Sequence, residues 1–211
     1  GFAERSRIAW WETAADVIEK TNEIRCDFGA GVEEISTRTM SEKAAAFALI
    51  ERMIETIDED TAVARVEALA VEHGIDPMDF IRRELMVKEE IAKLGEEPLC
   101  TLGGHTLTHC NLARVDENRL EREIRESSAR IVQWTGKPVE TFAYPYGKDF
   151  AACQREFAAT ADAGVVAAVT TRPGLLGANS DATGLPRVSL NGHYQTRRYL
   201  QALMTGIPFR Y

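Results

Sequence analysis

Short apolar runs alternate with amphipathic stretches through the second half of the chain, and this alternation constrains the fold more than any other feature of the sequence. The apolar runs lie at residues 99–103, 141–146, 165–171 and 185–190. Helix-like stretches separate the first run from the second and the second from the third, and they end at Gly136 and Gly164. Strand–helix–strand alternation is typical of βαβ units, which build parallel sheets or barrels. We therefore predict an α/β fold for this half.

The first half of the chain has the apolar spacing of helices. Residues that recur every three or four positions predict helices over 8–20, 39–57, 58–74 and 76–94. Thr39 and Glu42 have the spacing of a capping box, and Asp76 followed by Pro77 is typical of a helix start. We predict that this half is almost wholly helical, with Gly29-Ala30-Gly31 as an interruption and Gly95 as the end of the last helix.

Two of the four histidines, His105 and His109, lie directly after the first apolar run and a Gly-Gly pair. A His-x-x-x-His pair at a strand-to-helix junction can direct two imidazoles at one divalent ion. Tyr146 ends the second apolar run, and ligands of parallel α/β folds gather at the carboxyl ends of the strands. We expect His105 and Tyr146 on the same rim. Taken alone, the two histidines also fit a simpler interpretation, in which they are polar residues at the start of a helix.

Charge and composition exclude some classes of function. The net charge of −8 leaves no basic stripe for a nucleic acid, and no apolar run approaches the roughly 20 residues that span a bilayer. The first five residues lack the apolar segment of a signal peptide. The four cysteines form no Cys-x-x-Cys motif, which predicts reduced thiols in a cytoplasmic protein. Export by a leader upstream, with one or two disulfides, stays open.

Two segments resemble the motifs of a known family. Residues 105–109 (His-Thr-Leu-Thr-His) resemble the His-(Ser/Thr)-x-x-His motif of the polysaccharide deacetylases, and residues 142–147 resemble their Pro-Tyr-Gly segment. Residues 186–189 resemble a late strand of some bacterial members. The resemblance implies an incomplete or distorted (β/α) barrel. Residues 1–211 would then form a single domain, in which 1–96 are a large, mostly helical insertion and 97–211 are the barrel half.

The same resemblance implies metal-dependent hydrolysis of a carbon–nitrogen bond, with acetate released from an N-acetyl sugar. It assigns a divalent ion, most often zinc, to His105 and His109. The backbone N–H of Tyr146 would stabilise negative charge on the reacting carbonyl, as in an oxyanion hole. Pro145 and Tyr144 belong to the expected substrate-binding segment. His193, which follows the fourth apolar run, is the candidate general acid.

The chain also departs from the family pattern. It has no adjacent Asp-Asp pair, which in the family supplies a third metal ligand and the general base. Phe142, Ala143 and Tyr144 occupy positions where members often carry an Arg. We therefore expect a fragment that lacks the first strand. Its open sheet edge would favour pairing with a second copy.

Other functions stay open beside the deacetylase, whose expected partner is a carbohydrate or a small amide. Related members of the superfamily suggest a hydrolase of cyclic amides or ureides. A non-catalytic metal-binding or interaction protein on the same fold is another hypothesis, as is a helical interaction module built on residues 8–95.

Overall fold

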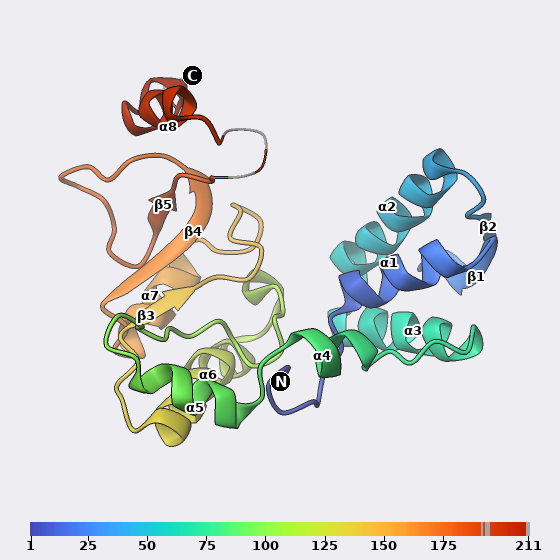
Figure 1. The fold of residues 1–211 in the computed structure, drawn as a ribbon, viewed down its shortest axis with the longest axis horizontal. Helices are drawn as coiled ribbons and strands as arrows, with labels where there is room; N and C mark the ends of the chain where they lie inside the picture. Colours follow the sequence, from blue (N-terminus) through green and yellow to red (C-terminus); the bar gives the residue numbers. More distant parts are fainter. Residues whose placement is uncertain (191, 193–194, 210–211) are drawn as a thin grey trace. The chain divides into compact units, whose positions relative to one another are not determined.

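The computed structural model describes residues 1–190, 192 and 195–209. It divides the chain into two compact units, Gly1–Lys88 and Glu89–Tyr211 (Figure 1). None of the helices that it describes is long and apolar enough to cross a membrane.

Local sequence signals explain the helices of the first unit. These helices are α1 (Trp10–Lys20), α2 (Met40–Thr56), α3 (Glu59–Glu72) and α4 (Asp79–Glu84). The predicted capping box is present at the start of α2, where the Thr39 N–H donates to Glu42 Oε2 at 2.8 Å. Asp58 caps α3 by accepting the Thr61 N–H at 2.9 Å. The α1, α2 and α3 helices bury Val17, Ile50, Met53 and Val66 completely, so their apolar faces form the core of this unit.

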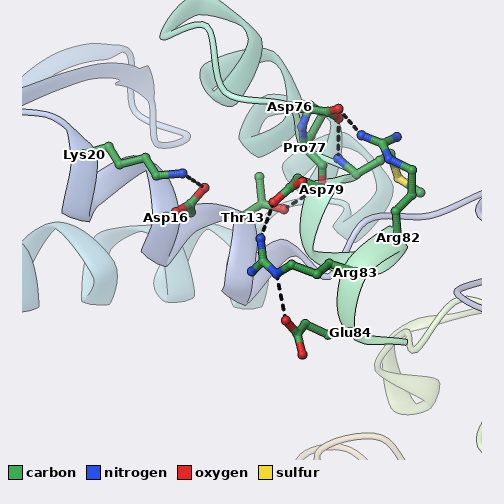
Figure 2. A network of polar contacts seen from close by, with 10 residues as sticks. Thr13, Asp16, Lys20, Asp76, Pro77, Asp79, Arg82, Arg83 and Glu84 are labelled. Carbon is green, nitrogen blue, oxygen red and sulfur yellow. Dashed lines mark hydrogen bonds and ion pairs between the residues drawn. The ribbon is translucent and has the colours of Figure 1, made fainter. Parts of the chain in front are cut away.

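The start of α4 lies later than predicted. The helix begins at Asp79, because the Asp76 carboxylate accepts the N–H of Met78 in a turn and also pairs with Arg82 (Figure 2). The Thr13 hydroxyl donates to the Pro77 carbonyl at 3.2 Å, which attaches this turn to α1. The prediction of one helix over residues 76–94 was therefore wrong, because the helix begins three residues later and residues 79–84 and 88–96 form two separate helices.

The prediction that the first half is almost wholly helical was also wrong. Strands β1 (Glu23–Asp27) and β2 (Val32–Ser36) form an antiparallel hairpin. Gly29 and Gly31 have φ angles of +109° and +124°, which L side chains rarely adopt, and the Asp27 carboxylate accepts both of their N–H groups. The interruption expected at these glycines is thus the turn of a hairpin.

The second unit contains a three-stranded parallel sheet with helices packed against it (Figure 1). Its helices are α5 (Lys88–Glu96), α6 (Glu117–Thr135), α7 (Gln154–Asp162) and α8 (Arg197–Met204), with short 3-10 helices at Leu112–Arg114 and Ile207–Phe209. Its strands are β3 (Thr141–Ala143), β4 (Ala167–Pro173) and β5 (Leu185–Arg187). Both strand pairs, β3 with β4 and β4 with β5, are parallel. The β3–α7–β4 segment is the predicted βαβ unit.

The core of the second unit lies between the sheet and its helices. Phe142 of β3 and Ala168 of β4 pack there with Leu120 and Ile124 of α6 and Phe157 of α7. The α6 helix ends as predicted at Gly136, whose left-handed φ of +68° suits a residue without a Cβ. Gly95, in contrast, lies inside α5 and does not end it.

The first apolar run is not a buried strand, which corrects the prediction. Leu99 is 102% exposed, and the Cys100 N–H bonds to the Glu97 carbonyl in a turn after α5. The one bridge that the structure describes for this segment comes just after it, between Gly104 and Phe142 of β3. A strand needs backbone hydrogen bonds to a neighbouring strand along its length. Residues 99–103 are apolar but form no such pairing in the part of the chain that the structure describes.

Candidate functional site

The loop that carries the two histidines begins at the bridge between Gly104 and β3. The Gly104 N–H donates to the Thr141 carbonyl at 2.8 Å, and the Ala143 N–H donates to the Gly104 carbonyl at 2.9 Å. A Cβ at Gly104 would lie 2.7 Å from the Phe142 ring, closer than real contacts allow. Glycine at this position therefore lets the loop backbone approach β3, and His105 follows directly beside the end of that strand.

His105 is held in one tautomer. Its Nδ1 lies 2.6 Å from the Ala143 carbonyl oxygen. Because a carbonyl only accepts, Nδ1 must carry the proton, and Nε2 of the neutral ring keeps its lone pair. Burial lowers the pKa of His105, the Ala143 hydrogen bond partly opposes this shift, and the positive charge of Arg187 lowers the pKa further. The lowered pKa favours the neutral ring, which is the form that binds metal ions.

The loop and the Tyr146 segment share an uncommon backbone conformation. Thr106, His109 and Tyr146 have φ angles of +63°, +59° and +61°. Arg5 is the only other non-glycine residue with positive φ in the described part of the chain. Such conformations are unfavourable for residues with a Cβ and cluster at functional sites. The Thr106 hydroxyl supports the loop by accepting the His109 N–H at 2.9 Å.

Glu123 of α6 anchors the histidine loop, and the sequence analysis missed it. Its side chain is fully buried. Oε2 accepts the N–H groups of Leu107 at 2.8 Å and Thr108 at 3.0 Å, while Oε1 accepts the Thr108 hydroxyl at 2.7 Å. The signal was present in the sequence, because Glu123 lies on the apolar face of α6, three residues after Leu120 and next to Ile124. An acid on such a stripe indicates a buried partner.

Aromatic rings connect the predicted site residues. The His105 and His109 ring centroids are 4.9 Å apart, and the centroids of His109 and Tyr146 are 5.4 Å apart. The Phe150 ring lies next to Tyr146, at 6.5 Å. The structure therefore brings together three residues that the sequence analysis selected from two distant segments, as expected for one rim.

His105 offers Nε2 in the tautomer described above, and the His109 ring lies beside it, so this loop could supply two nitrogen donors to a divalent ion. Among the described residues, no group of three or more His, Cys, Asp or Glu side chains is placed to hold a metal. The pair could supply at most two coordination positions, whereas a structural zinc site almost always has four ligands.

Three other residues that were expected at the site, Tyr144, Pro145 and His193, are not part of this ring cluster as described. Tyr144 is only 2% exposed, packs against Phe142 and Phe157, and donates its hydroxyl to the Thr183 carbonyl at 2.7 Å. Its side chain belongs to the core, which corrects the expectation that Tyr144 contacts substrate. Pro145 is likewise buried. His193 lies outside the described residues, so its role stays a prediction.

Comparisons with known proteins give a family match for part of the chain. The family model for polysaccharide deacetylases matches residues 39–167. A polysaccharide deacetylase from Bacillus cereus is 23% identical with a TM-score of 0.50, and the match covers 58% of this chain and 37% of that one. A putative polysaccharide deacetylase from Bacillus anthracis is 21% identical with a TM-score of 0.48, covering 72% of this chain and 48% of that one. No curated protein sequence matches the chain.

A third solved structure is a Streptococcus pyogenes deacetylase in complex with acetate. It is 17% identical with a TM-score of 0.45, and the match covers 56% of each chain. The chain thus spans between 37% and 56% of the length of these solved structures. The family model covers more than half of the chain and includes both the histidine loop and the Pro145–Gly147 turn. The resemblance expected from the sequence is therefore confirmed, and the chain belongs to the polysaccharide deacetylase family.

Proposed function

We propose that this chain contributes the histidine loop of a metal-dependent carbohydrate N-deacetylase, which hydrolyses an N-acetyl amide and releases acetate. The observation that carries the proposal is the pair of neighbouring imidazoles, His105 and His109, with the His105 tautomer set by Ala143. Membership of the family supports the same reaction class.

A divalent ion, with zinc as the first candidate, would be held by His105 and His109. When bound, such an ion lowers the pKa of its water to about 7 and polarises a carbonyl. The protein's own part is to hold the two rings in place. Ala143 fixes the His105 ring and Glu123 fixes the loop backbone between the rings.

Tyr146 and His193 have proposed roles at the reacting amide. The Tyr146 N–H would donate to the carbonyl oxygen as negative charge develops there, an interaction that strengthens in the transition state. The positive φ of Tyr146 sets the direction of this peptide group. His193 would protonate the leaving amine. We further propose that the three-stranded sheet is part of a distorted (β/α) barrel. Residues 1–96, which contain helices α1 to α5 and the β1–β2 hairpin, would be an insertion in it.

The test combines zinc binding with acetate release. Zinc affinity is measured by competition with a chromophoric chelator, and acetate release is measured on N-acetylated chitooligosaccharides with the full-length protein. His105→Ala and His109→Ala should each lower zinc affinity on the order of 100-fold or more, since losing even an outer partner of a metal ligand costs about 10- to 100-fold. Acetate release should fall with zinc affinity. His73→Ala is the matched control, because His73 is exposed at the end of α3.

The possible results separate the hypotheses. Unchanged acetate release in either site variant would refute the proposal. Zinc binding through both histidines without turnover of any amide would favour the non-catalytic metal-binding protein. Turnover of a cyclic imide, with no acetate released from the sugar, would favour the cyclic amide hydrolase.

A further inference from the structure

A cavity of about 930 Å³ adjoins the ring cluster, and the reaction proposed above does not use it. It lies at the carboxyl ends of β4 and β5, and the lining residues that matter here are Lys148, Asp149, Phe150, Thr171, Arg172 and Arg187. A cavity of this size accommodates a sugar with a substituent.

Two walls of the cavity are shared with the candidate site. The Thr171 hydroxyl donates to the Tyr146 carbonyl at 2.8 Å, and the Phe150 ring lies beside the Tyr146 ring. Arg187, at the end of β5, lines the same cavity. A substrate with its amide at Tyr146 and the histidines would therefore extend into this cavity.

The charge of the lining is opposite to that of the chain. The whole chain has 33 acidic and 25 basic residues, whereas the lining contains three cations and one carboxylate. That carboxylate is already engaged, because Asp149 Oδ1 lies 2.6 Å from Arg172 Nε.

The other two cations, Lys148 and Arg187, form no ion pair with a carboxylate in the part of the chain that the structure describes. Lys148 Nζ lies over the Phe150 ring at 5.9 Å from its centroid. The cavity therefore presents two uncompensated positive charges beside an aromatic ring.

We propose that this cavity binds an anionic group, a carboxylate or a phosphate, on the same saccharide whose amide is hydrolysed. The substrate class is then an acidic N-acyl sugar, and this inference rests on the proposed function. Arg187 supplies the planar, forked donor that matches carboxylate and phosphate oxygens, while Lys148 supplies a point charge. Phe150 supplies an apolar surface against which the sugar ring would pack.

The experiment compares four probes by NMR chemical-shift titration of the zinc-loaded protein. The probes are N-acetylglucosamine, N-acetylmuramic acid, N-acetylglucosamine 6-phosphate and inorganic phosphate. At low salt, at least one acidic sugar should bind roughly tenfold more tightly than the neutral sugar. The reason is that a hydrogen bond to a charged group contributes more binding free energy than one between neutral groups. Arg187→Gln and Lys148→Gln should each remove most of this advantage. Arg122→Gln, which removes an exposed positive charge from α6, is the matched control.

Each outcome has one reading. Equal affinity for neutral and acidic sugars overturns the inference, as does an acidic advantage that survives both substitutions. Phosphate alone binding as tightly as the sugar phosphate overturns the substrate class, since the sugar then adds nothing. Acetate release is followed in the same samples. Turnover without preference for acidic sugars refutes only the cavity inference, whereas an Arg187-dependent preference without turnover refutes only the proposed function.

Discussion

Replacement of Glu123 tests whether one buried carboxylate organises the histidine loop. Glu123→Ala removes the acceptor of two backbone N–H groups and one hydroxyl, at Leu107 and Thr108. Hydrogen bonds to charged groups contribute about 1.5–3 kcal/mol each, so three bonds set an upper bound of about 4.5–9 kcal/mol. The net loss is smaller, because the variant no longer buries a carboxylate. We expect a loss of about 3–5 kcal/mol in unfolding free energy of the second unit.

Two companion variants sharpen this prediction. Glu123→Gln keeps the shape and one acceptor oxygen but turns an NH₂ group toward a donor, so its expected loss is about 1–3 kcal/mol. Glu121→Ala is the control, because Glu121 lies on the same helix with a 64% exposed side chain that pairs with Arg125. Its expected loss is below about 1 kcal/mol.

The assay combines denaturant unfolding with amide hydrogen exchange. Because the chain has two compact units, unfolding of the second unit is followed separately, through exchange of core amides in β3 and β4. The Leu107 and Thr108 amides should lose protection in Glu123→Ala and keep it in Glu121→Ala. Zinc affinity should fall about 10- to 100-fold in Glu123→Ala, as for other outer partners of metal ligands. Unchanged protection of these two amides, or equal stability of both alanine variants, would show that the carboxylate does not hold the loop.

Three further predictions concern single positions. Burial raises the pKa of Tyr144 from its ordinary 10.0 to about 12, so between these pH values the unfolded chain loses this proton while the native one keeps it. Unfolding free energy should therefore fall as pH rises through this window, by up to about 2.7 kcal/mol, and urea unfolding of Tyr144→Phe should lack this component. Gly104→Ala forces Phe142 aside and should cost about 1–3 kcal/mol in urea unfolding. Gly177→Ala, where the new Cβ would meet only Ser180 Oγ at an ordinary 4.0 Å, should change little; equal midpoints would count against the close approach. Thr39→Ala removes the capping box of α2 and should cost about 0.5–2 kcal/mol by thermal unfolding; an unchanged melting temperature would contradict it.

Helices were the predictable part of this fold, and their caps show why. The Thr39–Glu42 box and the Gly136 end were both identified from the sequence, and both are present. A cap or an apolar stripe depends on residues within about four positions of each other, so a linear sequence contains the whole interaction.

Strands were less predictable, because a strand is defined by its partner. Residues 99–103 are apolar like a strand but do not pair with a neighbouring strand in the described part of the chain. The strands β1 and β2 were missed, although buried Ile24 and Cys26 alternate with exposed residues in β1. For β3, β4 and β5 the sequence predicted only parallel alternation, and their observed order depends on pairing between residues that are distant along the chain.

By itself, the sequence determined the chemistry that is available: two imidazoles four residues apart, and a Pro-Tyr-Gly turn at the end of a second apolar run. Tertiary structure decided what surrounds that chemistry. It placed Glu123 of α6 under the histidine loop, put Tyr144 in the core, and gathered Lys148 and Arg187 around one cavity. These contacts join residues that are distant along the chain, and their geometry depends on how the sheet and helices pack together, which no local pattern contains.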